Sequence, residues 1–166
     1  MSRCVNLNSI VLSSGVFSGC SSLYKVTLPS HITKIDTGAF EDCTALKNIT
    51  LPSGVLFIGE NAFRNSGITT LNSSNCVDLS TIPHIDGWAF YSCDNIEVVK
   101  FSRDPECHLK DSAFELCSNL TTIYLSKNTT LGNHTFRTCL KLNTIYFDGS
   151  EDDWEKYHNQ NDQWGL

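Results

Sequence analysis

The chain has 166 residues, 18% of them charged, and a formal net charge of −6. The charge is concentrated near the end, where residues 148–166 hold six acids against one lysine, and the other 147 residues are nearly neutral, with 12 acids and 11 bases. A nucleic-acid-binding or anionic-lipid-binding protein would need a basic face, so both classes are disfavoured. No apolar run approaches the length of a membrane span or a signal peptide.

The first element in chain order is a strand pattern that has no turn before it. Leu7, Ile10 and Leu12 follow the spacing seen in later strands, but the residues that would precede such a strand are missing. Residues 1–13 are therefore predicted to form a truncated or degenerate first coil.

Residues 14–147 repeat one pattern six times. The repeat is marked by phenylalanines spaced 23, 23, 27, 24 and 22 residues apart, namely Phe17, Phe40, Phe63, Phe90, Phe114 and Phe136. A unit this short is typical of a solenoid, because a helix pair or a four-stranded propeller blade needs more residues. Stacked coils of this kind bury a continuous core that no single coil could bury alone.

Residues 38–60 illustrate one coil. Ile49 and Leu51 alternate with polar residues, which predicts a strand with one buried face. Val55–Ile58 predicts a second, shorter strand. A short helical or 3₁₀ turn is expected over Ala39–Cys43, because it would point Phe40 and Cys43 the same way.

Five of the eight cysteines follow the repeated phenylalanines by three residues, and Ser66 takes this place in the third coil. These five are Cys20, Cys43, Cys93, Cys117 and Cys139. Cysteine behaves as a small hydrophobe, so a ladder of buried, reduced thiols is predicted. Cys4, Cys76 and Cys107 lie outside the ladder, and a Cys76–Cys107 disulfide stays open.

The long third interval contains an insertion at residues 72–80, rich in Asn and Ser. Insertions in repeats emerge as loops, often on the binding face. A neutral surface bulge is the alternative.

The outward residues of the first strand of each coil form a threonine-rich strip that ends in two tyrosines. Exposed threonines are common on strands, but exposed tyrosines are frequent anchors in protein interfaces. The candidate binding residues are Lys100, Thr122, Tyr124, Thr144 and Tyr146. No catalytic, cofactor-binding or metal-ligating motif is recognised, so the chain is predicted not to be an enzyme and to hold no cofactor or metal.

Residues 148–166 are predicted to form a helical cap over the last coil. Ser150 and Asp153 have the spacing of a capping box, and acids fill the first turn. Trp154 and Tyr157 would share the face that covers the core, with Trp164 as a possible addition.

The repeat resembles the BspA-like leucine-rich repeats. Ala39-Phe40, Cys43, Leu46 and Leu51-Pro52 match the family pattern position by position, as do Ile58-Gly59 and Ala62-Phe63. The resemblance implies an α/β or mostly-β solenoid, a right-handed superhelix of about six 22–27-residue coils with a C-terminal helical cap, in one domain over 1–166.

The same resemblance implies a protein-binding module of a secreted or cell-surface adhesion protein, which binds host or extracellular macromolecules. An intracellular scaffold or regulatory protein is the alternative, consistent with reduced thiols and the absence of a signal peptide. The oligomeric state stays open.

Overall fold

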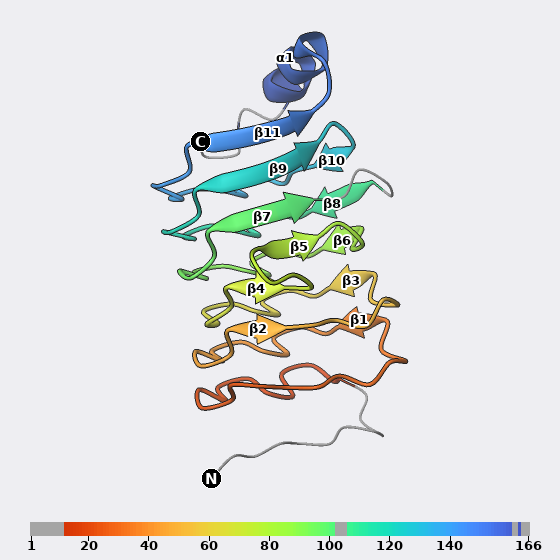
Figure 1. Ribbon diagram of the computed structural model, residues 1–166, viewed down its shortest axis with the longest axis vertical. Helices are drawn as coiled ribbons and strands as arrows, with labels where there is room; N and C mark the ends of the chain where they lie inside the picture. The colour runs from red at the N-terminus through yellow and green to blue at the C-terminus, as the bar shows by residue number, and fades with distance from the viewer. Residues whose placement is uncertain (1–11, 102–105, 161–162, 164–166) are drawn as a thin grey trace.

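The computed structural model of the chain describes residues 12–101, 106–160 and 163. The described coils stack along one axis into a solenoid, with parallel sheets along its length and a helix at the end after the last coil (Figure 1). This architecture confirms the predicted solenoid, in which six phenylalanines are separated by five full turns. Leu7, Ile10, Cys4 and Trp164 lie outside the described residues.

The first strand of each coil contributes to a six-stranded parallel sheet. Its members in chain order are β2 (Asn48–Ile49), β4 (Thr70–Leu71), β5 (Val77–Leu79), β7 (Val98–Phe101), β9 (Thr122–Ser126) and β11 (Thr144–Asp148). The strands grow from two to five residues toward the helix. In the first described coil, a single bridge at Thr27 takes the place of this strand.

The second, shorter strand of each coil builds a five-stranded parallel sheet. Its members are β1 (Lys34–Ile35), β3 (Phe57–Ile58), β6 (His84–Ile85), β8 (Cys107–Leu109) and β10 (Thr129–Thr130). Ile35, Ile58 and Ile85 stand in register and are buried, as the predicted alternation requires. The second strand prediction is therefore confirmed.

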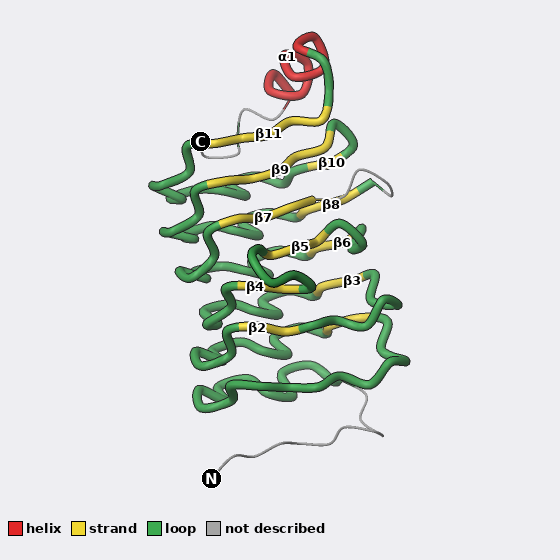
Figure 2. Tube along the Cα trace, in the orientation of Figure 1, coloured by secondary structure: helices red, strands yellow, loops and turns green. Residues whose placement is uncertain are grey.

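The expected helical turn over Ala39–Cys43 is wrong, because one left-handed residue stands directly before this segment and another lies inside it. Gly38 and Asp42 have positive φ angles of 61° and 58°, and the segment forms consecutive turns. Successive backbone amides alternate between hydrogen bonds within the turn and hydrogen bonds to the next coil. For example, Cys43 N donates to Phe40 O (3.3 Å), whereas Phe40 N donates to Ala62 O (2.7 Å). The inter-coil bonds of these turns form a third ladder. The turns themselves lie outside the two sheets (Figure 2).

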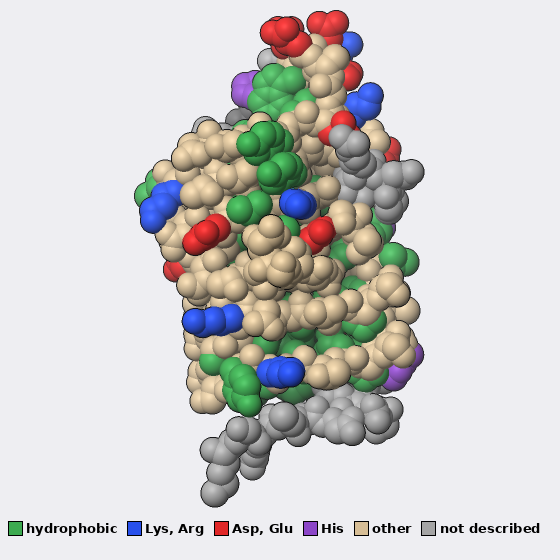
Figure 3. Space-filling model, in the orientation of Figure 1, with side chains coloured by type: hydrophobic (Ala, Val, Ile, Leu, Met, Phe, Trp, Pro, Cys, Tyr) green, Lys and Arg blue, Asp and Glu red, His purple; other side chains and the backbone are tan. Residues whose placement is uncertain are grey.

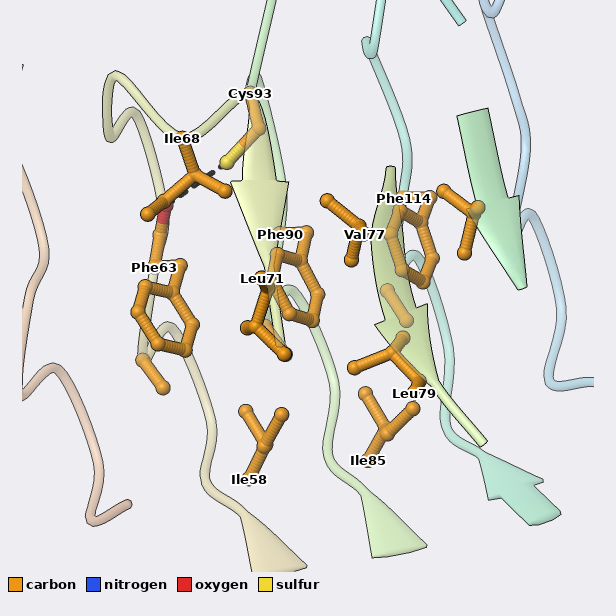
Figure 4. Close-up of a cluster of buried hydrophobic side chains, with 14 of the residues drawn as sticks. Ile58, Phe63, Ile68, Leu71, Val77, Leu79, Ile85, Phe90, Cys93 and Phe114 are labelled. Carbon is orange, nitrogen blue, oxygen red and sulfur yellow. Dashed lines mark hydrogen bonds between the residues drawn. The ribbon is translucent and has the colours of Figure 1, made fainter. Parts of the chain in front are cut away.

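The core is a stack of phenylalanine rings enclosed by aliphatic side chains. Phe63 lies 5.2 Å from Phe90, and Phe90 lies 4.8 Å from Phe114, measured between ring centroids, with nearly parallel rings. Ile58 and Ile85 from the five-stranded sheet pack near these rings together with the buried residues of β4 and β5 (Figure 4). Each ring therefore contacts both its own coil and its neighbours.

The cysteine ladder joins neighbouring coils through its thiols. Each buried thiol lies within hydrogen-bonding distance of the phenylalanine carbonyl of an adjacent coil: Cys43 with Phe17 O (3.2 Å), Cys93 with Phe63 O (2.9 Å), Cys117 with Phe90 O (3.2 Å) and Cys139 with Phe114 O (3.1 Å). Burial raises the pKa of both Cys43 and Cys93 to about 12. It also raises the pKa of Cys117 well above its ordinary value.

Cys20 departs from the prediction, since it is exposed. Each buried ladder thiol packs against the coil before it, and no described coil precedes that of Cys20. Cys76 is buried and is a free thiol, so the Cys76–Cys107 disulfide is not formed.

The insertion at 72–80 is divided between a short, partly exposed loop at 72–76, as predicted, and a strand that was not predicted. Asn72 turns the chain out of β4 with φ of 57°, and its side-chain oxygen accepts a hydrogen bond from Leu51 N (2.7 Å). The chain then re-enters the sheet as β5, where Val77 and Leu79 are fully buried. The additional residues are absorbed as an extra strand between β4 and β7, and the ring stack continues past them.

The predicted C-terminal helix is confirmed as α1 (Glu151–Gln160). Ser150 and Asp153 form the capping box, with both reciprocal bonds at 3.1 Å. Trp154 and Tyr157 lie 5.1 and 5.2 Å from the Phe147 ring, and the Tyr157 hydroxyl donates to Thr129 O (2.7 Å). In the part of the chain that the structure describes, no helix has the length and apolarity needed to cross a membrane.

Candidate binding face

The structure brings the five predicted binding residues together on one face of the six-stranded sheet. Strand pairing places Lys100 opposite Tyr124, and Tyr124 opposite Tyr146. In the adjacent row, Thr122 stands opposite Thr144. We refer to Lys100, Thr122, Tyr124, Thr144 and Tyr146 as the tyrosine face.

The two tyrosines form a stacked pair at the exposed surface. Their ring centroids are 4.6 Å apart and their planes differ by 15°. Lys100 Nζ lies 5.4 Å from the Tyr124 centroid, within range of a cation–π interaction. Tyr124 is 38% exposed and Tyr146 is 55% exposed, so the pair is held in place by its neighbours and still accessible.

The threonines beside the tyrosines are half-buried, and their hydroxyls are engaged locally. Thr122 Oγ1 lies 3.3 Å from Thr121 Oγ1, and Thr144 Oγ1 donates to Asn143 Oδ1 (2.7 Å). The two threonines therefore form a flat, half-buried surface next to the tyrosine rings. Figure 3 shows the same side of the molecule, with hydrophobic side chains gathered over β9 and β11 and a basic side chain next to them.

The strip does not continue through the earlier coils in the expected register. A strip built from the first strand of each coil would place Thr70 and Asn72 of the third coil beside β7, but β5 intervenes and places Asp78 opposite Lys100. The tyrosine face is thus bounded on this side by an acidic residue that sequence analysis did not select. The signal for it was the alternation in Val77-Asp78-Leu79, which matches a half-buried strand.

A shallow hollow of about 180 Å³ adjoins the two tyrosines. It is lined by Phe101, Tyr124, Leu125, Ser126, Tyr146, Phe147 and Asp148. Small-molecule sites typically measure roughly 300–1,000 Å³ and enclose most of the ligand. A hollow of this size suits a single side chain of a larger partner.

A second row of neighbouring side chains lies on the five-stranded sheet. The imidazoles of His84 and His108 stack with centroids 5.5 Å apart, and His108 Nδ1 lies 2.7 Å from Thr130 Oγ1. Their separation of one coil, 24 residues, is the signal that sequence analysis missed. Among the described residues, no group of three or more His, Cys, Asp or Glu side chains could hold a metal ion.

The stacked coils define the protein as a solenoid repeat protein, and comparison with known families identifies its family. The model described as a BspA type leucine-rich repeat region matches residues 10–143 and 71–163, with six copies. The chain therefore belongs to the BspA-type leucine-rich repeat family. Leucine-rich repeat proteins of this kind are non-enzymatic and typically bind other proteins.

Three solved structures are similar to this chain. A leucine-rich repeat protein of T. pallidum superposes with a TM-score of 0.65 at 22% identity, over 90% of this chain and 63% of that chain. A leucine-rich cell surface protein from Faecalibacterium prausnitzii gives a TM-score of 0.39 at 21% identity (87% and 59% of the two chains). A leucine-rich repeat protein from Bacteroides ovatus gives 0.45 at 22% identity (79% and 44%).

The similarity to the T. pallidum protein concerns the fold, and the chain spans less than two thirds of that protein's length. A search of curated proteins found no significant match.

Proposed function

We propose that the chain is a non-enzymatic binding module that presents the tyrosine face to a protein partner. The observation that carries the proposal is the stacked, exposed pair of Tyr124 and Tyr146 with Lys100 beside it. Exposed tyrosines combine a large apolar area with a polar hydroxyl and lose little side-chain entropy on binding, so they often dominate the binding energy of interfaces. Parallel strands on both sides of the core give this face a rigid support.

We further propose that the partner is an extracellular macromolecule, such as a host protein, and that the chain belongs to a secreted or cell-surface adhesion protein. This part rests on membership in the BspA-type family. Fold alone does not decide function.

An intracellular scaffold is the second candidate, because a specific feature favours it. Cys43, Cys93 and Cys117 are buried free thiols in the core, and Cys76 is another. Proteins of oxidising compartments more often form disulfides, so unlinked thiols suit a reducing compartment.

The two candidates are separated by capture of partners on the immobilised chain. Extracellular-matrix and serum proteins are offered in one arm and cytosolic proteins in the other. Retention of a specific protein from the first arm alone supports the adhesion role, and retention from the second alone supports the scaffold.

The site is tested on the captured partner with the double variant Tyr124→Ala/Tyr146→Ala. Truncating two interface anchors at about 1 kcal/mol each or more weakens binding by roughly 30-fold or more. Tyr24→Ala is the matched control, because Tyr24 is 52% exposed but lies in the first described coil. The thermal midpoints of all three proteins should agree within a few degrees. Unchanged affinity of the double variant would show that the partner binds elsewhere.

A further inference from the structure

A second candidate site lies on the turns that precede the core phenylalanines. Two residues before each of these phenylalanines, the backbone is left-handed, at Gly15, Gly38, Asn61, Trp88, Ser112 and His134. Left-handed backbone suits glycine and asparagine, whereas bulky side chains rarely adopt it. Trp88, with φ of 54°, has the bulkiest side chain of this series, so the requirements of the turn explain its presence least.

The Trp88 side chain is accessible and does not complete an aromatic cluster. It is 42% exposed. Within the described residues, no other ring and no cation lies in stacking contact with it, in contrast to Tyr124 and Trp154. One face of the indole is thus available to a ligand.

Trp88 lines an open groove of about 440 Å³ that is rich in carboxylates. The groove is formed by Glu60, Asp86, Gly87, Trp88, Leu109, Lys110, Asp111 and Gly132. Lys110 Nζ pairs with Asp86 Oδ1 at 3.1 Å. Glu60 and Asp111 have no ion-pair partner in the described part of the chain, so the groove carries two uncompensated negative charges.

The turn backbone holds these groups in place. Trp88 N donates to Asp111 O (3.2 Å), and Asp111 Oδ1 accepts a hydrogen bond from Asn133 N (2.8 Å). A Cβ at Gly132 would lie 2.5 Å from Asp111 N and 2.7 Å from Asp111 Oδ1. Glycine at this position is what allows the Asp111 carboxylate to lie at the groove.

We propose that this groove binds a basic side chain, the guanidinium of arginine or the ammonium of lysine, on a peptide partner. The cation lies over the Trp88 indole, which is the side chain best suited to cation–π interactions. The carboxylates of Glu60 and Asp111 accept its N–H groups in charge-assisted hydrogen bonds. A neutral sugar ring also stacks on an indole, but it would leave both carboxylates without a counter-charge.

The groove shares no residue with the tyrosine face, so this proposal stands independently of the proposed function. The two can be tested on the same protein with separate variants.

The test uses a short peptide with one central arginine and its twin with citrulline, which keeps the shape but removes the charge. Binding is followed by the indole N–H resonance of Trp88 in ¹⁵N-labelled protein, assigned by its loss in Trp88→Asn. The arginine peptide should shift this resonance saturably and bind at least about tenfold more tightly than the citrulline peptide. In Trp88→Asn, which lacks this resonance, binding is measured by titration calorimetry; the substitution should abolish binding and keep the fold, because Asn61 already occupies the same position one coil earlier.

The role of the two carboxylates is tested with Glu60→Gln/Asp111→Asn, which should lower the affinity for the arginine peptide at least about tenfold. Glu151→Gln/Asp152→Asn changes the net charge equally on the exposed start of α1 and should have no effect. Equal binding of both peptides, equal loss in both double variants, or a response to methyl glycosides instead of arginine would overturn the proposal.

Discussion

The stack of phenylalanine rings predicts a graded cost for replacing its members by alanine. Phe90 is fully buried and has ring neighbours at 5.2 and 4.8 Å, whereas Phe17 has one described neighbour, Phe40, at 5.4 Å. Phe→Ala in a core costs about 3–5 kcal/mol. Each aromatic pair contributes roughly 0.5–1.5 kcal/mol beyond the buried area, so Phe17→Ala should cost about 1 kcal/mol less than Phe90→Ala.

Urea unfolding followed by circular dichroism measures these differences as free energies of unfolding. Leu140→Ala is the matched control, because Leu140 is 83% exposed and its truncation should change stability by less than about 0.5 kcal/mol. In a solenoid each coil contacts only its neighbours, so a central cavity should also lower the m-value if the array splits into two unfolding units. Equal costs for Phe17→Ala and Phe90→Ala would refute the view that stacking between coils sets the stability of each layer.

Two further predictions concern the thiols and the glycines. Burial raises the pKa of Cys43 and Cys93 from 9.0 to about 12, so these thiols lose their protons in the unfolded chain at a lower pH than in the folded chain. The free energy of unfolding should therefore fall as the pH rises from 9 to 12. A urea midpoint that stays constant over this range would contradict the burial of the ladder. Gly67→Ala should cost about 1–3 kcal/mol in the same assay, because the new Cβ would lie 2.2 Å from Thr44 O. Gly54→Ala, whose Cβ would meet Ile32 O at 3.6 Å, should be nearly neutral, and similar losses in the two variants would rule out the contact as the cause.

The layered core could be predicted from the sequence because a side chain that recurs once per coil must occupy one position in every layer. The spacing of Phe40, Phe63 and Phe90 therefore indicated both the solenoid and its filling. Burial of an individual member was less certain, as Cys20 shows. A ladder thiol is covered by the coil before it, and a repeat pattern does not reveal whether that cover exists.

The turns were harder to predict, although part of the signal was present. Gly38 and Asn61 stand at the first left-handed position, and Gly19 and Asp42 at the second, all residue types that tolerate this conformation. Trp88, Leu116 and Thr138 occupy the same positions in other coils and conceal the pattern. The amides that alternate between local and inter-coil bonds fix this backbone, and they depend on neighbouring coils rather than on local propensity.

The outward face of β7, β9 and β11 followed from the period of two, so the tyrosine face could be placed in advance. Its boundary could not, because register beyond an insertion depends on how the additional residues are accommodated. Residues 72–80 supply another strand, and Asp78 rather than Asn72 becomes the neighbour of Lys100. The groove at Trp88 escaped notice because its carboxylates come from three successive coils.

The three ladders that join the coils also determine how the rod responds to pulling. Their hydrogen bonds run along the stacking axis, so tension applied between the two ends passes through every junction in series. A chain loaded this way opens at its weakest junction while the others stay closed. The first described coil has one bridge at Thr27 in place of a strand, so under tension it should be the first coil to separate from its neighbour.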